Sequence, residues 1–185
     1  MIPGGIQCQH ALADDARLHN RTASALGRNH PGGLTAFVDA MNAKAVSLGA
    51  TQTRYVDSSG LSPNNVSTPA DLGKIVAAAS SYETIRDYST TGAVNVQLPD
   101  SKRKLSFVNT NALVRNSDWK IGLSKTGYIS EAGKCLVMQA MIANQPVVIV
   151  LLDSWGKLTR VGDANRIRKW LEKNPTKVAT QFRSG

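Results

Sequence analysis

The residues with the clearest chemical potential are Lys125, Thr126 and Gly127, a Lys-Thr-Gly triplet on a short apolar stretch that leads into two further strand-like runs. This triplet is one of three elements found in serine enzymes that form acyl intermediates, the others being a Ser-x-x-Lys nucleophile and a Ser-x-Asn pair. Such chemistry needs a serine activated by a nearby base, and hydrogen-bond donors aimed at the developing oxyanion. The triplet alone is a weak signal, so its meaning depends on the other two elements.

The Ser-x-x-Lys pattern occurs three times, and none of the occurrences opens an apolar helix. Ser101 lies at an expected hairpin tip, Ser117 precedes an expected strand, and Ser154 lies in the turn before the last expected helix. Chance occurrence on polar loops explains these strings better than a displaced nucleophile does. The sequence therefore contains a Lys-Thr-Gly strand without an evident attacking serine.

Composition indicates one compact domain and limits its partners. The chain has 185 residues, of which 42% are hydrophobic, enough for one sizeable core. Its formal charge of +9 favours encounters with polyanions, but the basic residues are mostly dispersed along the chain. One cluster on an expected helix, Arg166, Arg168 and Lys169, is explained better by a solvated helix face than by a nucleic-acid site. The cysteines and histidines lack metal-site spacing, so neither a metal nor a cofactor is predicted. No apolar run is long enough to span a membrane.

Apolar periodicity predicts helices at both ends of the chain. Residues 20–26 and 34–48 have helical patterns separated by a break rich in Gly and Pro, and Gly49 follows the second pattern. A third helix is expected after Thr68, its predicted cap by residue type, with Pro69 at the first position and Asp71 near the positive end. A final helix is expected from about residue 157 or 159 to residue 173.

Five strands are expected between these helices. Two short ones, near residues 94–98 and 105–107, are joined by a hairpin at Pro99-Asp100-Ser101, and three longer ones cover residues 119–128, 134–142 and 147–152. The last strand is apolar throughout, which predicts cover on both of its faces. Helices, then consecutive strands, then one helix predict an α+β domain with an antiparallel sheet flanked by helices.

An ordered series of short motifs extends over residues 20–172 and is far more specific than the triplet. Its members are Met41–Lys44, Leu48-Gly49, Thr53–Val56, Ser59–Ser62, Ser67–Leu72, Lys125–Gly127 and Glu131–Gly133. The series resembles low-molecular-weight penicillin-binding proteins, the serine DD-peptidase family, and in particular the D-alanyl-D-alanine endopeptidase type. The resemblance implies a partial penicillin-binding protein/β-lactamase-like transpeptidase fold whose amino-terminal strands and nucleophile helix are missing.

The resemblance also implies roles for four substrate-binding residues. Lys125 offers positive charge to the carboxylate of a D-alanyl peptide or a β-lactam, and Thr126 donates a hydrogen bond to it. Gly127 lets the substrate backbone lie close to the strand, and the Tyr128 amide is one oxyanion donor. The expected partners are therefore peptidoglycan peptides and β-lactams.

The amino-terminal residues depart from the family pattern. Asn20 aligns with the end of the Ser-x-Asn motif and is its catalytic remnant, whereas Leu18 stands where the serine is expected and cannot relay a proton. We expect residues 1–19 to be an irregular leader foreign to the family, 20–173 to be the carboxy-terminal part of a serine DD-peptidase catalytic domain, and 174–185 to be a polar tail. Without its nucleophile the chain is predicted to be inactive.

The resemblance thus implies a serine-type D-Ala-D-Ala peptidase, endopeptidase or carboxypeptidase, acting on peptidoglycan cross-links in the periplasm. Two alternatives stay open: a non-catalytic peptidoglycan or β-lactam binding remnant, and a basic nucleic-acid binding domain, whose affinity would depend steeply on salt. No signal peptide is visible, so a chain made as written is expected in the cytoplasm.

The same resemblance predicts self-association. The strand at residues 147–152 would lose its family neighbours and become an apolar open edge, which invites pairing between chains and lowers stability.

Overall fold

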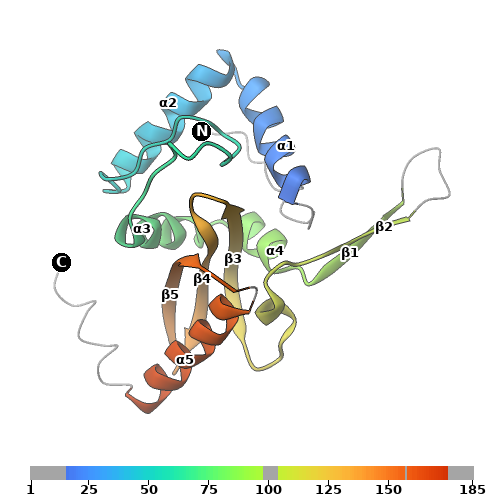
Figure 1. Ribbon diagram of the computed structural model, residues 1–185, viewed down its shortest axis with the longest axis vertical. Coiled ribbons are helices and arrows are strands. Elements are labelled where there is room, and N and C mark those ends of the chain that lie inside the picture. The colour runs from blue at the N-terminus through green and yellow to red at the C-terminus, as the bar shows by residue number, and fades with distance from the viewer. Residues whose placement is uncertain (1–15, 98–103, 157, 175–185) are drawn as a thin grey trace.

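The computed structural model describes residues 16–97, 104–156 and 158–174. At its amino-terminal end, α1 (Ala16–Arg28) and α2 (Gly33–Ser47) form a helical hairpin (Figure 1). The expected break and the expected end of the second helix are confirmed, because Gly32, Gly33 and Gly49 all have positive φ angles that other residues adopt at a cost. The first helix begins at Ala16, earlier than the expected start at residue 20. Ala45 is the only buried residue of α2, so this hairpin is lightly packed.

A second pair of helices, α3 (Pro69–Ala79) and α4 (Glu83–Thr90), follows an irregular loop. The predicted cap is confirmed: the Thr68 hydroxyl accepts a hydrogen bond of 3.2 Å from the Asp71 amide, with Pro69 at the first helical position. The sequence did not indicate α4, which is short and largely polar.

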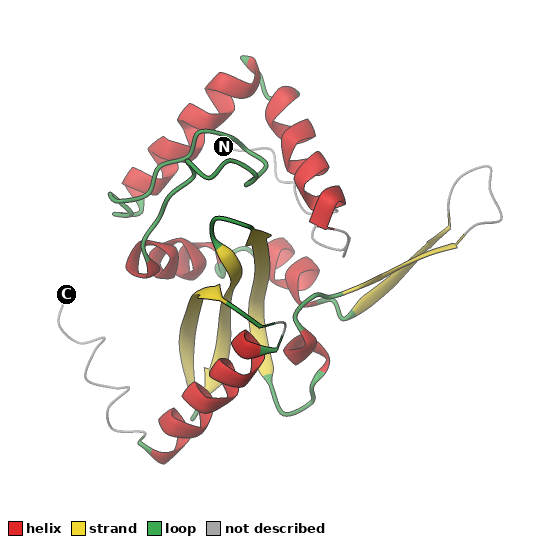
Figure 2. Ribbon diagram, viewed as in Figure 1, coloured by secondary structure: helices red, strands yellow, loops and turns green. Residues whose placement is uncertain are grey.

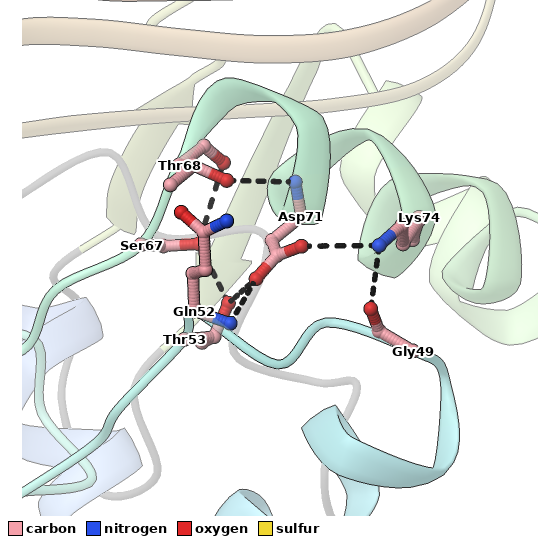
Figure 3. A network of polar contacts seen from close by, with 7 residues as sticks. All are labelled: Gly49, Gln52, Thr53, Ser67, Thr68, Asp71 and Lys74. Carbon is pink, nitrogen blue, oxygen red and sulfur yellow. Dashed lines mark hydrogen bonds and ion pairs between the residues drawn. The ribbon is translucent and has the colours of Figure 1, made fainter.

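The Asp71 carboxylate ties α3 to the end of α2 (Figure 3). It is 3% exposed and accepts hydrogen bonds from the Gln52 amide at 2.7 Å, the Thr53 hydroxyl at 3.1 Å and the Lys74 ammonium at 3.2 Å. Lys74 in turn donates to the carbonyl of Gly49. Burial alone would raise the pKa of the Asp71 carboxyl, but these hydrogen bonds and the Lys74 charge outweigh it and lower the pKa below its usual value.

The first two strands form a sheet of their own. β1 (Ala93–Gln97) and β2 (Lys104–Val108) pair antiparallel, from Ala93 opposite Val108 to Gln97 opposite Lys104. This pair extends away from the rest of the chain in Figure 1. The predicted strands are confirmed, while the expected turn at Pro99-Asp100-Ser101 lies outside the described residues. A single 3₁₀ turn, η1 (Ala112–Arg115), leads to the next strand.

The three long strands form an antiparallel meander in the order β3-β4-β5, as predicted. They are β3 (Lys120–Ile129), β4 (Gly133–Ile142) and β5 (Gln145–Ser154), and α5 (Thr159–Lys173) follows. Alternate residues of β4 carry the core, with Leu136, Met138, Ala140 and Ile142 at most 2% exposed. They pack with Ile149 of β5 and Ala164 of α5. Figure 2 shows α5 on one side of this sheet and α3 and α4 on the other.

β5 is an edge strand, and its cover is less complete than predicted. Both α3 and α5 contact it, but only Ile149 and Ser154 are buried along its length, and Leu152 is 37% exposed. An edge strand has one paired neighbour, so side chains near the open side are screened less well than in the middle of a sheet. The α+β class with an antiparallel sheet flanked by helices is confirmed.

Candidate functional site

A cavity of about 590 Å³ lies between the helical hairpin and the sheet. One wall comes from α1 and the loop at residues 55–60, and the opposite wall comes from the second half of β3. Met41 of α2, Asn65, Thr110 from the segment before η1, and Arg160 from the start of α5 also line it. The site is therefore assembled from segments far apart in the sequence.

All five residues selected from the sequence line this one cavity. Asn20 comes from α1, and Lys125, Thr126, Gly127 and Tyr128 are consecutive on β3. The structure thus brings the amino-terminal asparagine and the Lys-Thr-Gly strand to facing walls, although 105 positions separate Asn20 from Lys125 in the chain.

The strand wall offers a cation, a hydroxyl and open backbone. Lys125 is exposed, and its Nζ donates to the carbonyl of Thr126 at 2.5 Å. A Cβ added to Gly127 would meet nothing within 4 Å, so the backbone there is accessible to a ligand. Tyr128 is 61% exposed, and the Lys134 ammonium lies 4.9 Å from the centre of its ring. An extended peptide with a negative end fits these features.

Arg160 is a cavity residue that the sequence did not single out. Its Nη1 donates to the Cys135 carbonyl at 2.8 Å, which holds the guanidinium beside the strand that pairs with β3. Burial lowers the pKa of Arg160, and the neighbouring Cys135 partly opposes this, but a guanidinium stays charged at neutral pH. Two basic side chains, Lys125 and Arg160, therefore line the cavity together with the acidic Asp57, and they come from elements that only tertiary packing brings together.

Two serines, Ser58 and Ser59, also line the cavity, and neither hydroxyl is hydrogen-bonded to an amine within the part of the chain that the structure describes. Ser59 Oγ donates to Asp57 Oδ1 at 2.8 Å and accepts from the Leu61 amide at 3.3 Å. Within the described residues, the Ser58 hydroxyl makes no hydrogen bond.

Asp57 is a poor base for Ser59 because its carboxylate already accepts several hydrogen bonds from groups of the same loop. Burial acts to raise the pKa of Asp57, but hydrogen bonds from the Ser59 hydroxyl and from the amides of Ser62, Gly60 and Ser59 lower it below the usual value. These bonds are local and hold the loop in shape. The Ser-x-x-Lys serines that can be placed, Ser117 and Ser154, do not line the cavity.

Neither a metal site nor a membrane helix emerges from the described parts of the chain. Among those residues no group of three His, Cys, Asp or Glu side chains converges on a point that could hold a metal ion. Their helices are all too short or too polar to cross a bilayer. On α5, Arg166 pairs with Asp163 and Arg168 pairs with Glu172, so two of the three clustered cations have acidic partners.

Comparison with known proteins reveals clear relatives. The sequence profile of the D-alanyl-D-alanine carboxypeptidase family matches residues 16–156. The chain is 48% identical to a D-alanyl-D-alanine endopeptidase of Pseudomonas aeruginosa and 46% identical to one of Escherichia coli, in both cases over 153 residues that make up 83% of this chain and 49% of the relative. The chain thus spans about half the length of these relatives.

Solved structures agree with this relationship. The Streptomyces K15 DD-transpeptidase superposes with a TM-score of 0.71 at 28% identity, covering 83% of this chain and 61% of that one. The ampicillin-bound penicillin-binding protein D2 of Listeria monocytogenes gives a TM-score of 0.68 at 25% identity, covering 81% and 60%. The fold is therefore part of the penicillin-binding protein fold, as the motifs predicted. By sequence and by structure, the chain belongs to the D-alanyl-D-alanine carboxypeptidase family, the family of D-Ala-D-Ala peptidases that includes the D-alanyl-D-alanine endopeptidases.

Proposed function

We propose that this chain binds D-alanyl-D-alanine peptides and β-lactams along β3 without forming an acyl enzyme. One observation carries the proposal: Asn20, Lys125, Thr126, Gly127 and Tyr128 line a single cavity. In the proposed complex the ligand lies beside Gly127, its carboxylate faces the Lys125 ammonium and the Thr126 hydroxyl, and its carbonyl approaches the Tyr128 amide. The longer relatives are D-alanyl-D-alanine endopeptidases, and we assign the same substrate class, peptidoglycan cross-links, to this site.

Electrostatics supports an anionic ligand. Lys125 and Arg160 both line the cavity, and each attracts a ligand carboxylate more strongly when water is partly excluded. A charge-assisted hydrogen bond contributes about 1.5–3 kcal/mol, so loss of the Lys125 ammonium is expected to weaken binding about 10- to 100-fold. Because cross-linked peptidoglycan lies outside the cytoplasmic membrane, this role requires delivery to the periplasm.

The state of the serines supports binding without acylation. Acylation requires a hydroxyl that transfers its proton to a base, and in this family's chemistry that base is a lysine amine. Ser59 donates instead to Asp57, whose lowered pKa makes it a weak base, and the Ser58 hydroxyl has no hydrogen bond to an amine among the described residues. We therefore extend the proposal to domain organisation: residues 20–173 retain the ligand-binding half of a DD-peptidase catalytic domain.

A fluorescent penicillin tests both parts of the proposal. The expected result is reversible binding, measured by fluorescence anisotropy, that an acyl-D-Ala-D-Ala peptide displaces and that leaves no label after denaturing electrophoresis. Lys125→Ala should bind about 10- to 100-fold more weakly, whereas Lys120→Ala, which removes an exposed lysine at the far end of the same strand, should bind as wild type does.

Covalent labelling would overturn the non-catalytic part of the proposal, and the labelled serine could then be located with Ser58→Ala and Ser59→Ala. Equal binding by wild type and Lys125→Ala would overturn the assignment of the site itself. Tight, salt-sensitive binding of DNA with no response to D-Ala-D-Ala would favour the nucleic-acid alternative.

We also propose that copies of the chain associate through β5. This strand is ten residues long, lies at the sheet edge and has no charged residue between Gln145 and Leu152. Leu152→Lys should shift the mass measured by light scattering from dimer or larger toward monomer, because a charge on an edge strand opposes pairing. Val46→Lys, at a 62% exposed position on α2, is the matched control, and a wild-type monomer that melts cooperatively would contradict the proposal.

A further inference from the structure

Thr110 lines the cavity from outside the sheet and contacts the Lys-Thr-Gly strand directly. It lies between β2 and η1, and its hydroxyl oxygen is 2.5 Å from the hydroxyl oxygen of Thr126. A hydroxyl has one proton to donate and two lone pairs that accept. One member of this pair therefore donates to the other, and the direction of that hydrogen bond decides which proton remains for a ligand.

The two directions have different consequences for a ligand. When Thr126 donates to Thr110, its single proton is engaged and cannot reach a bound group. When Thr110 donates to Thr126, the Thr126 proton is available to an acceptor in the cavity, and accepting a hydrogen bond makes the Thr126 hydroxyl a stronger donor. A carboxylate is a strong acceptor that offers no proton in return, so it selects the second direction.

The segment that carries Thr110 is fixed on both sides. Asn109 Nδ2 donates to the carbonyl of Ser89 at 3.0 Å, which ties the segment to α4. Asn111 is 2% exposed, and its Nδ2 donates to Ser124 Oγ at 2.9 Å, which ties the segment to β3. Thr110 is itself exposed, so the hydroxyl pair is held in place yet accessible from the cavity.

We propose that Thr110 is a positioning residue that turns the Thr126 hydroxyl toward the ligand and so favours ligands ending in a free carboxylate. This inference rests on the proposed function of β3 as a carboxylate-binding strand. It deepens that proposal by predicting discrimination between two otherwise identical ligands, an acyl-D-Ala-D-Ala acid and its terminal carboxamide. The carboxamide can donate protons to the hydroxyl pair and carries no charge, so it does not need the orientation that Thr110 imposes.

The experiment compares N-acetyl-D-Ala-D-Ala with its carboxamide by NMR titration of the full chain. Thr110→Val should weaken binding of the acid about three- to tenfold, the size of one net hydrogen bond, and leave the weaker binding of the carboxamide unchanged. Thr110→Ser, which keeps the hydroxyl, should restore acid binding. Thr84→Val, at an exposed position of α4 away from the cavity, is the matched control and should bind both ligands as wild type does.

The outcomes separate this inference from the proposed function. If Thr126→Val loses acid binding while Thr110→Val binds as wild type does, the role of Thr110 is refuted and the carboxylate-binding strand stands. Equal loss of acid and carboxamide binding in Thr110→Val, or failure of Thr110→Ser to restore acid binding, indicates a general structural effect and also refutes it. If wild type does not prefer the acid and Lys125→Ala changes nothing, the proposed function fails first.

Discussion

Asn111 is the residue whose loss should most directly loosen the connection between the Thr110 segment and β3. Its side chain is 2% exposed, its Nδ2 donates to Ser124 Oγ, and its Oδ1 accepts from the Leu113 amide at 3.1 Å. Asn111→Ala removes these two hydrogen bonds and a weaker one from Nδ2 to Met138 Sδ at 3.8 Å, and it leaves the buried Leu113 amide without its partner. Each net hydrogen bond contributes about 1 kcal/mol and an unsatisfied buried group costs about 1–3 kcal/mol, so the free energy of unfolding should fall by about 2–4 kcal/mol.

Urea unfolding followed by tryptophan fluorescence measures this change, with Asn95→Ala as the matched control. Asn95 is exposed on β1, and its replacement should change the free energy of unfolding by less than about 0.5 kcal/mol. If Asn111→Ala unfolds with the same midpoint and slope as wild type, Asn111 does not bridge η1 and β3, and its hydrogen bonds do not hold Thr110 in place.

Three further predictions concern stability. Folding lowers the pKa of the Asp71 carboxyl, so its contribution to the free energy of unfolding is complete above its unfolded pKa of about 4 and is lost as the pH falls through the folded value. In an acid titration followed by circular dichroism, wild type should therefore be destabilised more steeply than Asp71→Asn below about pH 4. Thr68→Ala should cost about 1 kcal/mol in urea unfolding through loss of the helix cap, and Thr68→Ser should cost much less. Gly133→Ala should lower the melting temperature more than Gly60→Ala. Both positions have positive φ, but only at Gly133 would the new Cβ meet backbone, 2.9 Å from Asp153 Cα. Equal decreases in melting temperature would show that the structure relieves this contact at no cost.

Local patterns in the sequence were sufficient for elements whose stabilising contacts are themselves local. The α3 cap needs only Thr68, Pro69 and the following amide, and the strand meander follows from alternating apolar runs with short turns. In contrast, α4 was missed because its eight residues are mostly polar and are held by packing against β3. The separation of β1 and β2 into their own sheet was also missed, since alternation indicates a strand but not the sheet it joins.

The candidate site divides in the same way. The Lys-Thr-Gly triplet is contiguous, so its spacing was visible in the sequence, and Asn20 was found through the family pattern rather than through its chemistry. Arg160 and Thr110 carry no local signal. Arg160 is one of many arginines in a basic chain, and Thr110 is an ordinary loop threonine until folding places it against Thr126. Residues recruited by tertiary packing become recognisable only in three dimensions.

The unequal packing of the two cavity walls has a thermodynamic consequence. The strand wall rests on a core whose four β4 side chains are almost fully buried, whereas the opposite wall rests on a helical hairpin in which α2 buries only Ala45. Amide hydrogens of α1 and α2 should therefore exchange through sub-global opening at a lower free energy than those of β4. A ligand that contacts both walls binds only the molecules in which the hairpin is packed on the sheet. Its apparent dissociation constant therefore includes the free energy of the equilibrium between the open and packed states.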